Sequence, residues 1–321
     1  MQNNLIDLHH HGRPAAFFEV LAAAGRTTMG GRPFPPPWER ESALRMMDEE
    51  GIATAILSAP DADLLYRDSK IALRLSRILN EMFAEVAGAQ PDRFGGFASL
   101  PMPHLDMAIA EAIYALDLLK LDGVMLSTSY DGHYPGHPEF DPLMAELDRR
   151  QAVVFVHPAT PLGMDIRLLE FPASLLEYTF DTTRCIVNML HHDYPKRFAN
   201  IKFIFSHGGG AAPYLHNRLG LMEYFLQTGE FRKSAGRALR YFYYDVALAC
   251  SDPILEFLGH VVGFDRVVFG SDYPQAPQQM IQTSINTLSQ SGVISDDARK
   301  SIASDNARRL FPRLGKSGVF S

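Results

Sequence analysis

Several side chains able to bind a metal ion directly follow short apolar stretches of the sequence, at points far apart along the chain. They are His9, His11, His157 and Asp272. Three imidazoles and a carboxylate form a plausible ligand set for a divalent ion such as Zn²⁺ or Mn²⁺. A single metal ion therefore requires a fold that brings these four distant positions together.

His9 and His11 end an apolar segment that starts at Leu5 and has the composition of a β-strand. Because side chains alternate between the two faces of a strand, both rings should point the same way. Asp7 should lie on that face one step deeper, where a carboxylate could orient a ligand. Three successive histidines could also be a polar strand end or the remnant of a purification tag. A tag remnant would not continue an apolar strand, which favours metal binding.

The other polar positions each have an ordinary structural explanation when taken alone. His157 could be a satisfied structural histidine, and Asp272 could cap a helix or a turn. His207 also follows an apolar stretch and precedes three glycines, which let backbone or substrate come close to its ring. All these positions lie at the same end of predicted strands, whereas random placement would scatter them over both ends. The joint pattern indicates one site, with His207 as an additional acid or base.

The apolar segments predict about eight short strands, separated by longer stretches with helical periodicity. The strands are expected at residues 5–8, 52–57, 94–98, 123–126, 153–156, 202–205, 242–245 and 267–269. This alternation favours a closed (β/α)8 barrel, a TIM barrel of the α/β class, over an open sheet. In such a barrel the strand ends that carry the candidate ligands form one rim.

Helices with one buried face are expected where apolar residues recur every three to four positions. One series is Ile71, Leu75, Ile78, Met82, Phe83 and Val86, and a second is Ile109, Ile113, Leu116 and Leu119. Longer connections around residues 33–37, 130–142 and 158–172 follow strands one, four and five, so we expect these inserted loops on the C-terminal face as walls of a substrate site. Residues 1–315 are expected to form a single barrel domain and residues 316–321 a loose tail.

Composition and charge exclude several other classes of function. The 321 residues are 46% hydrophobic and 21% charged, and the formal charge of −7 is spread along the chain, without the basic block of a nucleic-acid or membrane partner. Two cysteines are too few for a disulfide framework. The sequence shows neither a signal-peptide pattern nor an apolar run long enough to span a bilayer. We therefore expect a cytoplasmic protein.

Longer motifs surround the candidate ligands, and further motifs lie in the segments between them. In chain order they are Asp7-Leu8-His9-His10-His11, Asp122-Gly123-Val124, Tyr130-Asp131-Gly132, Val156-His157-Pro158, Asp181-Thr182-Thr183-Arg184, Ser206-His207-Gly208-Gly209, Gly270-Ser271-Asp272-Tyr273-Pro274 and Asp305-Asn306-Ala307. Through these motifs the chain resembles the aminocarboxymuconate semialdehyde decarboxylase-like branch of the amidohydrolase superfamily. The resemblance covers nearly the whole sequence.

The resemblance implies a (β/α)8 barrel with one divalent ion on His9, His11, His157 and Asp272, and with His207 beside it to handle a proton or activate water. Members of the family are mainly non-oxidative decarboxylases of small aromatic or unsaturated acids, and a minority are hydrolases. We therefore expect a metal-dependent carboxy-lyase acting on a hydroxybenzoate-like or muconate-like acid. Zn²⁺ is the first choice of ion and Mn²⁺ the second, with no organic cofactor.

Two alternatives and one open question accompany this expectation. A hydrolase of a lactone or ester would use the same residues, and a metal-binding barrel without catalysis would keep only the ligands. For decarboxylation, Asp272 or His207 would deliver the proton, Asp272 only if its surroundings raise its proton affinity. The resemblance also suggests a homodimer or a dimer of dimers.

A small carboxylate substrate should meet a cation, because an arginine side chain matches a carboxylate in geometry. Arg184 is the first candidate, although it could equally form a surface or inter-subunit salt bridge, and Arg13 is the second. Trp38 and Tyr273 could supply apolar walls for an aromatic ring, although ordinary packing explains either one.

Overall fold

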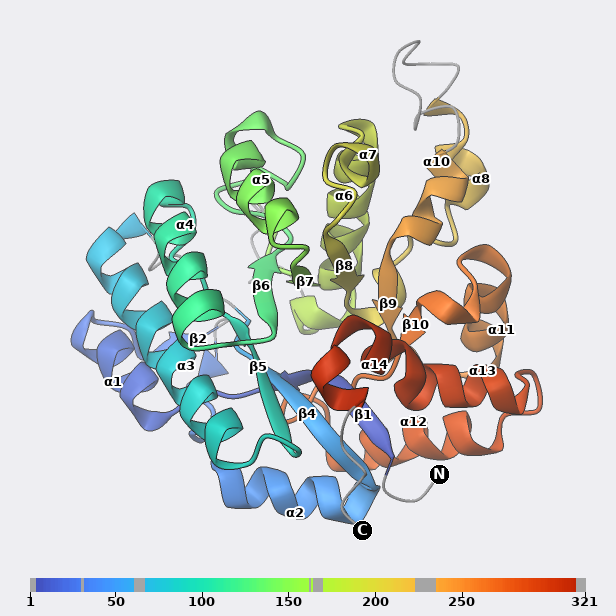
Figure 1. The fold of residues 1–321 in the computed structure, drawn as a ribbon, viewed down its shortest axis with the longest axis horizontal. Helices are drawn as coiled ribbons and strands as arrows, with labels where there is room; N and C mark the ends of the chain where they lie inside the picture. Colours follow the sequence, from blue (N-terminus) through green and yellow to red (C-terminus); the bar gives the residue numbers. More distant parts are fainter. Residues whose placement is uncertain are drawn as a thin grey trace.

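The computed structural model describes residues 4–29, 32–60, 67–161, 163, 170–222 and 235–315. Within them, eight parallel strands form one sheet, which helices surround (Figure 1). In their order in the sheet the strands are β1 (Leu5–His11), β4 (Ile52–Ser58), β5 (Phe94–Ala98), β6 (Gly123–Ser127), β7 (Val153–His157), β8 (Lys202–Phe205), β9 (Tyr243–Asp245) and β10 (Val267–Val268). All eight predicted strands are confirmed, with small differences at their ends.

The first and last strands of the sheet meet and close the barrel. Past the end of β10, the backbone N–H of Asp272 donates to the carbonyl of His9 at 2.8 Å. The N–H of His11 donates in the opposite direction, to the carbonyl of Tyr273 at 2.7 Å. The predicted (β/α)8 barrel is therefore confirmed, and its closing seam runs through three of the four candidate ligands.

Helices fill the connections between the strands and cover the outside of the barrel (Figure 1). They are α1 (Ala15–Ala23), α2 (Arg40–Glu50), α3 (Ser69–Ala89), α4 (Leu105–Ile113), α5 (Asp141–Arg149), α6 (Glu177–His191), α7 (Tyr194–Arg197), α8 (His216–Leu219), α10 (Ala235–Ala238), α11 (Asp252–Val261), α12 (Gln278–Gln290), α13 (Asp296–Lys300) and α14 (Asn306–Leu310). A small antiparallel pair, β2 (Thr28–Met29) and β3 (Arg32–Pro33), lies in the connection after β1.

The helix α3 matches the first predicted series, because Leu75, Phe83 and Val86 are buried on its inner face. The second series is partly wrong. Its helix α4 ends at Ile113, which is 38% exposed, and a π-helical turn over Tyr114–Leu118 follows. Ile109, Leu116 and Leu119 pack against the core only in part, and the fully buried positions of this segment are the small residues Ala108, Ala112 and Ala115.

Apolar side chains fill the barrel interior below the candidate ligands. Ile6, Leu8 and Phe155 belong to one buried cluster that continues to Phe311, just past α14. Phe311 is 3% exposed, and its ring lies 5.9 Å from that of Phe97. The interior below the rim is thus a packed core, and polar side chains gather at the carboxyl ends of the strands.

The predicted loops and tail are only partly described. Residues 33–37 lie between β1 and β4, and residues 130–142 follow β6 and lead into α5. Of the predicted 158–172 loop, residues 162 and 164–169 fall outside the described residues, as does the whole predicted tail at 316–321.

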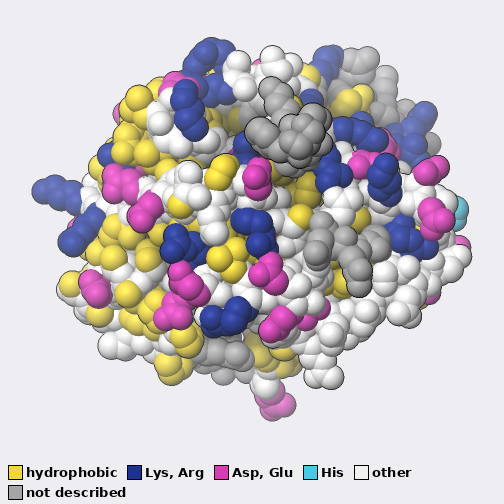
Figure 2. Space-filling view, turned by 60° about the horizontal axis from the view of Figure 1, so that its bottom comes forward, with side chains coloured by type: hydrophobic (Ala, Val, Ile, Leu, Met, Phe, Trp, Pro, Cys, Tyr) yellow, Lys and Arg dark blue, Asp and Glu magenta, His cyan; other side chains and the backbone are white. Residues whose placement is uncertain are grey.

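The surface carries charges of both signs. Figure 2 shows basic and acidic side chains interspersed over the face in view, with hydrophobic side chains between them. Among the described residues, no helix combines the length and the hydropathy needed to cross a membrane.

Candidate metal centre

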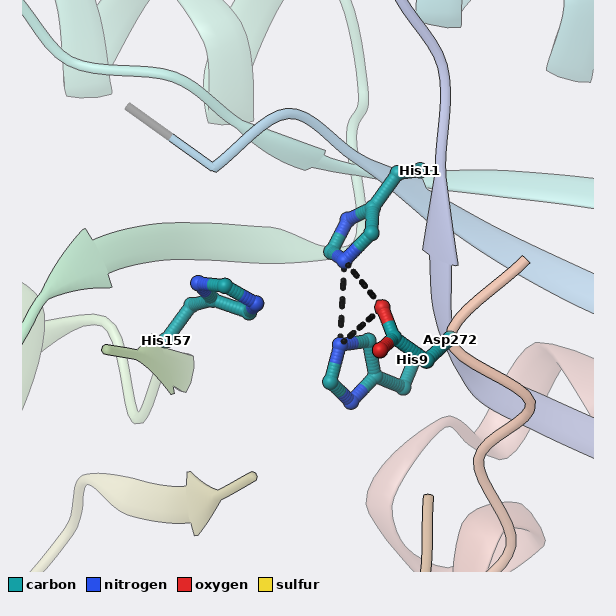
Figure 3. Close-up of side chains that lie close together, drawn as sticks. All are labelled: His9, His11, His157 and Asp272. Atoms are coloured by element: carbon teal, nitrogen blue, oxygen red, sulfur yellow. Dashed lines mark hydrogen bonds and ion pairs between the residues drawn. The ribbon is translucent and has the colours of Figure 1, made fainter. Parts of the chain in front are cut away.

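Four side chains from three separate parts of the chain converge at the carboxyl ends of the strands. They are His9 and His11 from β1, His157 from β7 and Asp272 from the segment after β10, and a nitrogen or oxygen of each lies within 4.8 Å of one from every other. Figure 3 shows the four side chains facing a common point. The predicted convergence is therefore confirmed, and the four residues are called the His-Asp cluster below.

The three histidines of the cluster point the same ring nitrogen inward. His9 Nδ1 lies 2.7 Å from Asp245 Oδ2, and His157 Nδ1 lies 3.0 Å from the carbonyl of Pro158. Because both partners are acceptors, each Nδ1 carries a hydrogen, and Nε2 is the ring nitrogen left to face the other members of the cluster.

His11 is oriented in the same way by a hydroxyl group. Its Nδ1 lies 3.0 Å from Ser58 Oγ, and Ser58 Oγ donates its own hydrogen to the carbonyl of His10. The serine oxygen is thus an acceptor for His11. Ser58 ends β4 beside β1, and nothing in the sequence pattern singles it out.

The inward atoms lie at distances that suit a shared cation. Nε2 of His9 and Nε2 of His11 are 3.0 Å apart, and Asp272 Oδ1 lies 3.4 Å from the first and 3.0 Å from the second. Ligands of a tetrahedral ion at about 2.1 Å lie about 3.4 Å from one another. Asp272 Oδ1 is buried and accepts no hydrogen bond of ordinary geometry from the described residues. These donors fit one divalent metal ion.

Asp7 does not share the face of His9 and His11, which corrects the sequence prediction. The pairing of β1 with β4 is irregular between Asp7 and His10, where a β-bulge interrupts the alternation of side chains. Leu8 and His9 therefore both face the barrel interior, the ring of His9 lying 4.9 Å from that of Phe155. Asp7 faces His10 instead, with Oδ2 3.2 Å from His10 Nδ1.

The carboxylate of Asp7 holds the barrel seam from below the cluster. Oδ1 accepts hydrogen bonds from the N–H of His9 at 3.0 Å and from the N–H of Ser271 at 2.9 Å. Oδ2 accepts a bond from the hydroxyl of Ser271 at 2.5 Å. Asp7 thus fixes the backbone beside two candidate ligands, His9 and Asp272, and orients no ring of the cluster.

Asp245 orients the ring that Asp7 was predicted to orient, and the sequence analysis missed it. It ends β9, is fully buried, and bonds His9 through Oδ2. Its Oδ1 accepts hydrogen bonds from the N–H of His207 at 2.9 Å and from the N–H of Ala247 at 3.0 Å. A signal was available, because Asp245 ends a predicted strand at the same rim as the other polar residues.

His207 stands next to the cluster without belonging to it. Its ring centroid lies 5.0 Å from that of His9 and 5.9 Å from that of His157. Nδ1 is 3.0 Å from the carbonyl of Ala247, so it carries the hydrogen and Nε2 is left to exchange a proton.

Two residues of the site have a left-handed backbone, which is unusual outside glycine. The φ angle is 54° at His207 and 60° at Asp272. Such conformations cost energy and persist only where the surrounding structure imposes them. After His207 the chain continues through three glycines with positive φ, and a Cβ at Gly209 would meet the ring of Tyr244 at 2.6 Å. The glycine turn therefore serves close packing behind His207.

Burial and neighbouring charges together shift the pKa values of the cluster members in opposite directions. Burial favours neutral His9, but Asp245 and Asp272 outweigh it and raise its pKa to about 10. Burial lowers the pKa of His11 to about 3 and that of His157 well below 6.5. Burial would raise the pKa of Asp272, but His9 and His11 hold it well below 3.8. The raised proton affinity that Asp272 needs as a donor is absent in the metal-free protein.

Comparison with known proteins identifies the family. A model of the amidohydrolase family matches residues 6–313. The chain belongs to the amidohydrolase family.

Similar amidohydrolases include two fungal proteins. The decarboxylase yanB of Aspergillus niger is 37% identical, over 96% of this chain and 88% of its own. The 6-methylsalicylic acid decarboxylase of Penicillium expansum is 33% identical, over 96% of each chain. Among solved structures, a dihydroxybenzoic acid decarboxylase from Polaromonas with bound manganese and the inhibitor 2-nitroresorcinol has a TM-score of 0.81 at 23% identity, covering 98% of both chains.

The two candidate arginines of this amidohydrolase differ in position. Arg13 is buried and donates to the carbonyl of Pro60 at 2.7 Å. The pKa of His11 is lowered mainly by burial, and the positive charge of Arg13 adds a smaller lowering. This electrostatic effect places Arg13 beside the cluster. Arg184 is exposed on α6, where its charge acts on Asp181 and Tyr134. The structure therefore favours Arg13 over Arg184 as the arginine beside the cluster.

Trp38 and Tyr273, the aromatic residues predicted to line the substrate site, both contact His10. Of the three successive histidines in β1, His10 is the one outside the cluster. Trp38 Nε1 donates to His10 Nε2 at 3.4 Å, and the ring of Tyr273 lies 4.9 Å from that of His10. The Trp38 ring also covers Gly12, where a Cβ would lie 3.4 Å from it. Both aromatic residues thus pack around the end of β1.

Gly270→Ala tests how closely the amidohydrolase centre depends on backbone packing. An added Cβ would lie 2.7 Å from Cβ of His9, closer than real Cβ atoms approach, and 3.2 Å from Cβ of Asp245, which is a tight contact. Overpacking of this kind costs about 1–3 kcal/mol, and here it would separate His9 from Asp245. We expect the affinity for a divalent ion to fall at least about tenfold, measured by calorimetric titration with Mn²⁺. Gly292→Ala, where an added Cβ meets nothing within 4 Å, is the matched control. Unchanged affinity in Gly270→Ala would contradict this account.

Proposed function

We propose that this amidohydrolase is a metal-dependent, non-oxidative decarboxylase of a small aromatic acid. One observation carries the proposal: the buried His-Asp cluster lies at the rim of a barrel whose relatives, 33% and 37% identical over nearly the whole chain, are decarboxylases. The names of these relatives favour decarboxylation over hydrolysis of a lactone or ester. No contact among the described residues favours the hydrolase.

The metal ligands in this proposal are His9, His11, His157 and Asp272. Support comes from their inward Nε2 atoms and from the buried Asp272 Oδ1, which lacks an ordinary hydrogen bond in the described structure. The sequence favoured Zn²⁺ over Mn²⁺. The Polaromonas structure contains manganese, so we propose Mn²⁺ as the first ion to load and Zn²⁺ as the second. Histidine with carboxylate suits either ion.

The substrate in this proposal is a benzoic acid with a hydroxyl group next to the carboxylate. Both 6-methylsalicylic acid and a dihydroxybenzoic acid are substrates named for the relatives. A divalent ion held by His9, His11, His157 and Asp272 would supply positive charge that attracts the carboxylate group and stabilises negative charge developing on the ring. Arg13 adds a fixed positive charge beside the cluster, and Trp38 and Tyr273 contribute apolar surface near the end of β1.

Decarboxylation breaks the bond between the ring carbon and the carboxylate, and the same carbon must receive a proton. His207 can exchange a proton at Nε2, because its Nδ1 is engaged with Ala247. Asp272 is the second candidate, although its low pKa in the metal-free protein disfavours the protonated form. Asp245 positions both the ring of His9 and the backbone of His207, so the ligand and the proton carrier keep a fixed relation.

The function is tested by incubating Mn²⁺-loaded protein with 6-methylsalicylate, 2,6-dihydroxybenzoate and a muconate-like acid. We expect CO₂ release together with loss of the carboxylate from at least one hydroxybenzoate. Addition of water to a lactone or ester without CO₂ release would instead favour the hydrolase. Tight metal binding without turnover of any compound would favour the inactive barrel.

Two variants separate metal binding from proton transfer in this assay. Asp272→Ala should lose both the bound metal and turnover. His207→Gln should keep the metal and lower kcat by about 10²-fold to 10⁴-fold, the usual contribution of a general acid or base. Undiminished activity in Asp272→Ala would overturn the site assignment.

Metal affinity should depend on pH, because the metal-free His9 is protonated up to about pH 10. A metal ion must displace that proton, whereas His11 and His157 are already neutral at pH 7. Lowering the pH therefore opposes binding, and we expect affinity for Mn²⁺ to fall about tenfold for each pH unit between pH 8.5 and 6.5. Titration in buffers with different ionisation enthalpies should count about one proton released. Affinity independent of pH would contradict the raised pKa of His9.

We also propose that the chain acts as a homodimer or a dimer of dimers. Support comes from exposed apolar side chains at the start of α6 and after the glycine turn. These are Leu175, Leu176, Phe180 and Tyr214, exposed by 72%, 40%, 41% and 76%. Arg184 follows one helical turn after Phe180, where it would meet a second copy. Light scattering should give twice or four times the mass of one chain, and a monomer at micromolar concentration would contradict the proposal.

A further inference from the structure

A second group of metal-binding side chains lies outside the His-Asp cluster. His133, His137 and Glu139 follow β6, in the loop that leads into α5, and a nitrogen or oxygen of each lies within 4.8 Å of one from the others. Their side chains are 51%, 48% and 36% exposed. We call these three residues the loop cluster. No step of the proposed decarboxylation uses them.

The carboxylate of Glu139 lies between the two histidines. Oε1 is 2.5 Å from His133 Nδ1, and Oε2 is 3.6 Å from His137 Nδ1. The two imidazole rings stack with their centroids 4.6 Å apart and their planes 24° from parallel. Both Nδ1 atoms therefore face the same carboxylate from adjacent, nearly parallel rings.

Hydrogen bonds hold the loop in this shape before any ligand arrives. Tyr130 and His133 bond each other through both backbone groups at 2.9 Å. Tyr134 donates its hydroxyl to the buried carboxylate of Asp181 at 2.6 Å, which ties the loop to α6. Asn188, also on α6, donates to the carbonyl of Pro135 at 2.9 Å. The donors of the loop cluster are thus supported by a helix of the barrel, which lowers the cost of ordering them on binding.

Charge and hydrogen bonding at this position favour a bound metal ion over an ion pair between a protonated histidine and Glu139. Two protonated imidazoles at 4.6 Å would repel each other, so one carboxylate does not satisfy both as cations. His137 Nδ1 has only a weak contact with a donor, the N–H of Glu139 at 3.4 Å, and this contact requires its lone pair. The Oε2 atom of Glu139 lies 3.6 Å from the same nitrogen, beyond ordinary hydrogen-bond distance. A metal ion that replaced the long N–H contact would bind both the nitrogen and the carboxylate.

We propose that the loop cluster binds one divalent ion of a borderline transition metal, such as Zn²⁺. The ligands are Nδ1 of His133, Nδ1 of His137 and a carboxylate oxygen of Glu139, and water fills the remaining positions because the site is exposed. Two imidazoles and a carboxylate suit zinc, whereas magnesium and calcium prefer sets made of oxygen alone. The site is distinct from the decarboxylation centre, because it shares no residue with the His-Asp cluster.

The test compares the zinc bound by the wild-type chain with the zinc bound by the double variant His133→Ala/His137→Ala. Equilibrium dialysis against Zn²⁺ with elemental analysis gives the number of ions per chain. We expect the double variant to bind one ion fewer than wild type and to keep the wild-type circular dichroism spectrum. The readout is the difference between the two proteins, so it holds whether or not the His-Asp cluster also takes zinc.

Two single variants refine the comparison. Glu139→Gln keeps the size of the side chain and removes its charge, and it should weaken this zinc site at least about tenfold. His260→Ala removes an exposed histidine from α11, outside the loop cluster, and should leave zinc binding unchanged. Equal zinc binding by wild type and the double variant would overturn the proposal. So would a loss in His260→Ala that equals the loss in the double variant.

Discussion

The buried carboxylate of Asp7 is the constraint on which the architecture of the centre depends. It accepts hydrogen bonds from the backbone of His9 in β1 and from the backbone and hydroxyl of Ser271 past the end of β10. A buried carboxylate is stable only if such donors satisfy it, so the two segments must stay together to meet that need. The residues that follow these contacts on each side, His11 and Asp272, are thereby brought within 3.0 Å of each other.

The orientation of the rings follows from a set of acceptors around that seam. A carboxylate, a hydroxyl oxygen and a carbonyl each take one Nδ1 hydrogen, from His9, His11 and His157. The inward nitrogens therefore do not depend on a metal ion for their direction. Without an ion, however, the same arrangement crowds polar atoms and holds an extra proton on His9. Binding of a cation would relieve this crowding and release the proton, so the unfavourable energy of the metal-free arrangement adds to the free energy of metal binding.

The strands and the general position of the site could be predicted because they depend on local sequence. Apolar runs bounded by turn residues predict strands, and polar residues at the same end of several runs predict a shared rim. The face occupied by Asp7 could not be predicted, because the β-bulge after it has no signature in residue type. Asp245 carried a usable signal as the last residue of a predicted strand. Ser58 carried no such signal, since its hydrogen bond to His11 exists only because β4 lies beside β1 in the barrel. The preference for Arg184 over Arg13 as the cation for the substrate rested on motif position and stays a prediction, and tertiary packing adds only that Arg13 lies near the cluster.

The closing seam of the barrel has a consequence for how the protein is made. The candidate ligands of the metal come from both ends of the strand order, with His9 and His11 in β1 and Asp272 past β10. A ribosome must therefore synthesise more than four-fifths of the 321-residue chain before the two halves of the coordination set coexist. Chains that stop shortly before Asp272 contain the three histidines, but the side of β1 that faces the last strand stays open and the centre is not closed. Binding of an ion by all four candidate ligands thus requires a chain that has passed the last strand and a barrel that has closed.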